Sequence, residues 1–198
     1  MTIRRPLAAL VLAAAAVTTL AQTPIRLKEE DVYFNYSPVH GKRGMCGFQI
    51  RGNQSSREVP RPEWDLNIDE IVAGEQRVAG ISAGAFEVVS QDRKAPRRPR
   101  APIVALSFTI KGDEQIITAQ IVGRPNPVNG IRAMLDEAPA RRLFKALYNA
   151  ELITISLRYQ DETGDVLQVR NWRDRRQLGG EKNNYFDECL NGFRPHEN

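Results

Sequence analysis

The stretch 140–159 changes its hydrophobic period halfway along, and this change constrains the fold more than any other feature of the chain. From Leu152 onward, apolar and polar residues alternate, which is typical of a strand with one buried face. Pro139 suits the first helical turn, and Asn149 suits the helix end. We therefore expect a helix that docks onto the strand following it. The helical face is marked by three- and four-residue spacing of Ala140, Leu143, Phe144, Leu147 and Tyr148.

Several further runs of β-branched and alternating residues predict strands joined by turns. We expect bulges or close backbone approach at Gly80 and Gly84, a hairpin turn at Gly112, and a short helical segment over 131–137. Residues 22–44 have the composition of an irregular arm. The sequence thus predicts an α+β fold, mostly antiparallel and sandwich-like, with one main helix in the C-terminal half. The expected strands cover residues 48–51, 64–72, 77–89, 103–111, 115–122 and 166–172.

The first 21 residues have the features of a secretory signal peptide. Arg4 and Arg5 precede the apolar run 7–20, and small residues occupy the cleavage-site positions. We therefore expect export to the periplasm or secretion, with no transmembrane segment in the mature chain. Residues 22–198 are expected to form one α+β domain, and the basic, proline-rich segment 91–102 is the candidate internal boundary.

Arginine-rich segments are the candidate binding residues. The net charge is +4, and removing the two signal-peptide arginines leaves +2, which is too mild to indicate nucleic acid. Arginine recognises carboxylate and phosphate groups in bidentate fashion, so we expect an acidic envelope component or partner protein. An inhibitor or immunity protein fits this interpretation as well, and a solvated surface is the alternative. The candidates are Arg97, Arg98, Arg100, Arg173, Arg175 and Arg176.

The chain contains two cysteines, Cys46 and Cys189, which lie near opposite ends of the expected mature chain. In an oxidising compartment an even pair favours a disulfide. Two separate buried thiols are the alternative. The sequence has no C-x-x-C pair, which argues against a dithiol oxidoreductase.

The motif Gly80-Ile81-Ser82-Ala83-Gly84 matches the G-x-S-x-G nucleophile elbow, and it is similar to the elbow of patatin-like lipases and of some esterases. This pattern supports the alternative hypothesis of a small secreted serine hydrolase, with His40 or His196 as the base. However, the residues after Ser82 continue as a strand pattern, whereas an elbow requires a helix there. We therefore favour a non-enzymatic binding protein. No metal-ligand spacing or nucleotide fingerprint is present, and no cofactor is expected.

Overall fold

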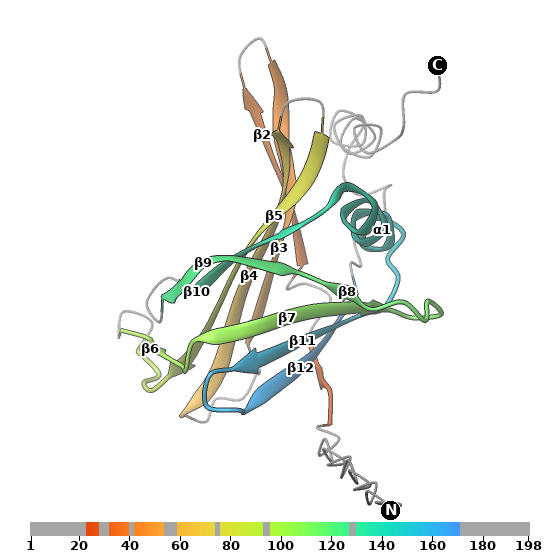
Figure 1. Cartoon of the computed structure of the whole chain (residues 1–198). Coiled ribbons are helices and arrows are strands. Elements are labelled where there is room, and N and C mark those ends of the chain that lie inside the picture. The colour runs from red at the N-terminus through yellow and green to blue at the C-terminus, as the bar shows by residue number, and fades with distance from the viewer. Residues whose placement is uncertain are drawn as a thin grey trace, which may run out of the picture.

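The computed structural model describes residues 23–27, 32–39, 42–53, 59–73, 76–92, 96–126 and 130–170 of the 198-residue chain. These residues form two mostly antiparallel sheets and one helix, α1 (Glu137–Tyr148) (Figure 1). Within these ranges no helix has the length and apolar character needed to cross a membrane. The strands are β1 (Ile25–Arg26), β2 (Val32–Val39), β3 (Lys42–Asn53), β4 (Arg61–Ala73), β5 (Gln76–Val88), β6 (Arg98–Pro99), β7 (Ile103–Ile110), β8 (Ile117–Thr118), β9 (Gln120–Asn126), β10 (Gly130–Leu135), β11 (Ile153–Tyr159) and β12 (Gly164–Val169).

The larger sheet has seven strands and is built on a meander of long hairpins. Its order is β2-β3-β4-β5-β10-β9, and β6 also pairs with β5. β10 pairs with residues 79–83 of β5, and β6 pairs with residues 86–87 farther along the same strand. β6 therefore continues the sheet beside β5 where β10 has ended.

The smaller sheet has five strands in the order β1-β12-β11-β7-β8. β1 is parallel to β12, and the other neighbours are antiparallel. The chain passes from one sheet to the other between β1 and β2, between β6 and β7, between β8 and β9, and again through α1 before β11 (Figure 1). The short segment between β6 and β7 thus links the two sheets directly.

Alternation along the strands produces a hydrophobic core to which both sheets contribute. On β4, Trp64, Leu66 and Ile68 are fully buried, while the intervening residues are partly exposed. Removing each such side chain from water stabilises the fold by about 1.5–3 kcal/mol. Figure 1 shows the two sheets meeting along this core, with α1 covering one end. The smaller sheet contributes buried residues that include Leu106, Phe108, Ile155, Leu157 and Leu167.

Helix α1 lies where its hydrophobic pattern placed it, but it packs differently from the expectation. It lies mainly against β5 and β7, one strand from each sheet, whereas the sequence predicted docking onto β11. The Phe144 ring also meets Phe48 of β3 edge-on, with 5.6 Å between ring centroids. Asn149 caps the C-terminal end at φ −79°, and Ala150 takes the left-handed conformation at φ 54°. The helix therefore helps to close the core between the sheets.

Three other local predictions are corrected by strand pairing. Residues 131–135 belong to β10, because Ile131, Ala133 and Leu135 alternate with more exposed residues and form a buried row. The segment 22–44, expected to be irregular, contains β2 and the start of β3, which form a hairpin. After the turn at Gly112, only the two residues of β8 pair with β7 before the chain crosses to the other sheet.

The glycines of β5 serve side-chain packing, because the β4–β5 register is continuous and contains no bulge there. A Cβ atom at Gly80 would lie 2.3 Å from Cδ1 of Ile71, and one at Gly84 would lie 2.9 Å from Cε2 of Phe86. Gly130 approaches the same strand with its backbone, since a Cβ there would lie 1.9 Å from the carbonyl oxygen of Ala83. Of the two predicted alternatives, a bulge or a close approach, the structure therefore shows the close approach.

Candidate functional site

Residues 96–100, here called the basic strap, run along the edge of the larger sheet and lead into β7. β6 pairs with β5, and the backbone N–H of Arg100 donates to the carbonyl of Ala85 at 3.0 Å. Proline is tolerated in such a short edge strand because few ladder hydrogen bonds are lost. Each strap arginine is also paired with a carboxylate. The ion pairs are Arg97–Glu63 at 2.9 Å, Arg98–Glu87 at 3.4 Å, and Arg100–Asp165.

The three arginines of the basic strap differ in burial. The side chains of Arg97 and Arg98 are 52% and 71% exposed, whereas that of Arg100 is 28% exposed. Exposed ion pairs contribute only about 0–1 kcal/mol, so their partners can be exchanged at little cost. Arg97 also lies over the ring of Phe86, with 6.0 Å to the ring centroid. Arg97 and Arg98 are therefore accessible cations, and Arg100 is an anchor.

Asp165, at the start of β12, organises a polar cluster between the two sheets. Its Oδ2 atom accepts hydrogen bonds from Trp64 Nε1 at 2.8 Å, from Tyr159 OH at 2.6 Å and from Nη1 of Arg100. The guanidinium of Arg100 also stacks over the Tyr159 ring, 4.7 Å from its centroid. Burial raises the pKa of Tyr159 well above its usual value, and the neighbouring Asp165 raises it further. Tyr159 therefore remains a neutral donor.

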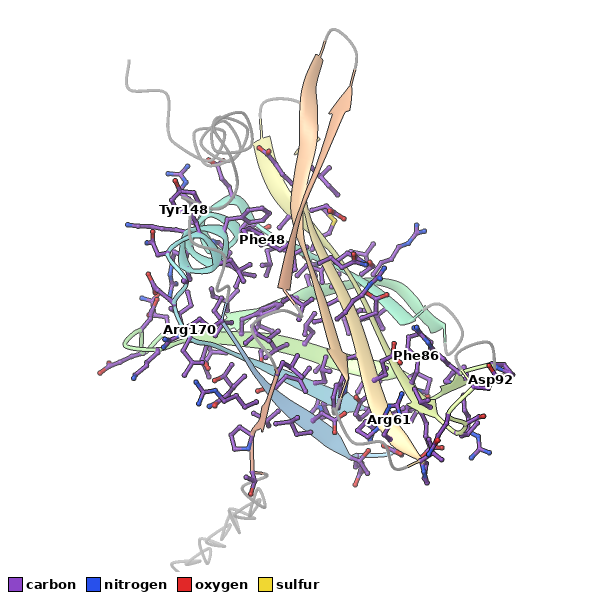
Figure 2. All side chains as sticks on the ribbon, turned by 180° about the vertical axis from the view of Figure 1, so that it is seen from behind. Phe48, Arg61, Phe86, Asp92, Tyr148 and Arg170 are labelled. Atoms are coloured by element: carbon purple, nitrogen blue, oxygen red, sulfur yellow. The ribbon has the colours of Figure 1, made fainter. Side chains whose placement is uncertain are left out.

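A pocket of about 180 Å³ opens beside this cluster. Its walls come from the start of β4, the end of β5, the residue after β6 and the start of β12, so both sheets contribute. Figure 2 shows Arg61 at the same end of the molecule as Asp92, away from Tyr148 on α1. Among the residues with defined positions, the lining consists of Pro60, Arg61, Pro62, Glu87, Arg100 and Asp165.

Ser82 lies in the middle of β5, between Asn67 of β4 and Arg132 of β10. It is partly buried, and its Oγ accepts a hydrogen bond from Asn67 Nδ2 at 3.3 Å. A nucleophile elbow instead places its serine on a sharp turn between a strand and a helix. The local geometry here is that of a paired strand. His40 and His196, the predicted bases, fall outside the described ranges, so serine catalysis stays a prediction.

Several other predicted residues also fall outside the described ranges: Arg173, Arg175, Arg176 and Cys189. Cys46 is on β3, in register with Tyr36 of β2, and the disulfide stays a prediction. Arg170, the first arginine of the second cluster, is exposed and lies toward α1 in Figure 2, away from Arg61. The basic strap is therefore the predicted Arg-rich segment that lies within the described ranges.

Comparisons with protein-family models, curated proteins and solved structures found no match to this chain. The functional interpretation therefore rests on the geometry of the chain itself. Sequence reasoning selected the arginines of the basic strap but missed the partners that hold them. Trp64 and Asp165 are separated by 101 residues, and Arg100 and Asp165 by 65 residues. No local pattern could have paired residues so far apart.

Proposed function

We propose that this protein is an exported bacterial envelope protein, periplasmic or secreted, that binds an acidic partner and is not an enzyme. In this proposal the two sheets and the helix form one α+β, sandwich-like domain, and Arg-rich segments make the contact. The observation that supports it most is the basic strap, in which Arg100 is anchored while Arg97 and Arg98 remain exposed. Such a strap presents two cations from a fixed backbone.

Arg97 and Arg98 are each bound to a glutamate of the protein, and an anionic group of the partner can compete with that glutamate. Glu63 of β4 is paired with the guanidinium of Arg97, and Glu87 of β5 is paired with that of Arg98. A carboxylate or phosphate of the partner can compete for either guanidinium, because both arginine side chains are more than half exposed and a guanidinium donates two hydrogen bonds to one such group. Holding the strap in place before binding also reduces the entropy lost on association.

Charge removal on the basic strap tests this proposal. The double change Arg97→Ser and Arg98→Ser is expected to reduce capture of the partner from envelope extracts several-fold, with an unchanged melting temperature. The matched control, Arg132→Ser with Arg158→Ser, removes two exposed arginines elsewhere and should capture as the unchanged protein does. Equal capture by both double variants would remove the basic strap from the binding surface.

A fluorophosphonate probe tests the alternative activity. We expect the folded protein to remain unlabelled, because Ser82 is held in a paired strand by its bond with Asn67. Labelling that disappears in Ser82→Ala would overturn the binding proposal and identify a serine hydrolase.

A further inference from the structure

We propose that the pocket between the two sheets binds a single carboxylate group of an acidic peptide, through the unused N–H edge of Arg100 and the guanidinium of Arg61. This inference rests on the proposed function, since it places one acidic side chain of the partner within the fold. The basic strap would then contribute the anchored Arg100 at one end and the exposed Arg97 and Arg98 at the other.

The hydrogen bonds of Arg100 to Asp165 and Tyr159 do not use all of its N–H donors. A guanidinium carries five N–H groups, and the bonds of Arg100 to Asp165 and Tyr159 both use Nη1. Nε and Nη2 have no hydrogen-bond partner within the described part of the chain, and neither is a buried, unsatisfied atom. In this proposal the Nε–Nη2 edge is the part of Arg100 that binds a ligand in the pocket, because Arg100 is one of the lining residues. Two adjacent N–H groups of this kind match the two oxygens of a carboxylate.

The guanidinium of Arg100 is already fixed in place. Stacking on Tyr159 and the bond to Asp165 hold its plane, and its backbone N–H bonds to β5. A flexible arginine loses side-chain entropy when it binds an anion, which weakens the binding. Because Arg100 is already held in the folded protein, most of this side-chain entropy is lost during folding and not on binding. Even a single carboxylate can therefore be recognised.

The negative charges at the pocket are compensated by the protein itself. Glu87 is paired with Arg98, and Asp165 receives three donors on one oxygen. Arg61 adds a second cation to the lining. The rings of Pro60 and Pro62 provide apolar surface for the methylene groups of a glutamate side chain. The volume of about 180 Å³ leaves room for one side chain.

The test is a titration with acetyl-Gly-Glu-Gly-amide, followed by NMR of the Trp64 indole N–H and the Arg100 Nε–H. The chain has two tryptophans, so Trp172→Phe assigns the Trp64 signal. We expect both signals to shift saturably with the Glu peptide and to remain in place with acetyl-Gly-Gln-Gly-amide. Arg61→Gln should weaken the binding while leaving the Asp165 cluster intact. Equal shifts from both peptides would overturn the proposal.

Arg100→Lys is the decisive variant, because lysine keeps the positive charge beside Asp165 but lacks the second N–H edge. Once thermal unfolding shows that the variant is folded, we expect peptide binding to be weaker by at least about tenfold, because both hydrogen bonds of the bidentate contact are lost. Binding as tight as in the unchanged protein would overturn the pocket assignment. Arg97→Ser leaves the Arg98–Glu87 pair in place and should retain peptide binding, so failure of extract capture and failure of the pocket are separate results.

Discussion

Replacing Asp165 with Asn keeps the shape of the side chain and removes the charge to which three donors point. Trp64, Tyr159 and Arg100 come from different parts of the chain and all bond to the same oxygen, Oδ2. An amide oxygen can accept these bonds only as a neutral group. Its NH₂ group adds donors to a site that already has a surplus of them. The side chain of Asp165 is 12% exposed, so water cannot readily replace the lost interaction.

The expected loss follows from the three hydrogen bonds. A bond to a charged acceptor contributes about 1.5–3 kcal/mol and a neutral one about 0.5–1.5 kcal/mol, a difference of about 1 kcal/mol for each bond. Solvent screening at Arg100, which is 28% exposed, reduces the sum of about 3 to about 2 kcal/mol. For a chain of this length, a loss of that size lowers the melting temperature by about 4–8 °C.

Thermal unfolding followed by circular dichroism at pH 7 measures this loss. The control is Asp161→Asn in the exposed turn before β12, where Asp161 accepts hydrogen bonds from the backbone N–H and the hydroxyl of Thr163. The control should melt close to the unchanged protein. A drop of less than about 1 °C for Asp165→Asn would refute the reasoning, because the cluster would then contribute little to holding the sheets together. The difference should persist in high salt, since partly buried pairs are weakly screened.

Two further changes test the packing of the larger sheet. Gly130→Ala should destabilise the protein by several kcal/mol more than Gly112→Ala, as measured by urea unfolding: both glycines have positive φ, but only Gly130 meets a neighbouring backbone. Equal losses would exclude the steric clash. Burial raises the pKa of Asp69, so the folded state gains stability as the pH falls through that raised pKa. Asp69→Asn should therefore raise the melting temperature at pH 7, with the gain disappearing below pH 3.8, and a gain that is constant with pH would contradict this assignment.

The sequence by itself determined the local elements with a strong period. Helix α1, β11 and the alternating β4 lie close to their predicted positions, because burial of one face dictates a period of 3.6 or 2 residues. The arginines of the basic strap were also recognisable, since charge is a property of composition. Segment 131–135 was missed because its alternation is short and adjoins a helix.

Only the tertiary structure decided which residues became partners. The order of the strands within each sheet, the crossing after β8 and the location of α1 against β5 and β7 depend on contacts between distant segments. The role of Asp165 also depends on distant segments. In the sequence it is an ordinary residue beside a turn, and only the fold brings Trp64 and Arg100 into hydrogen-bonding contact with it. A local pattern reports which face of an element is buried, but it carries no information about what covers that face. The division of the strap arginines into one anchor and two exposed cations is therefore a product of the fold.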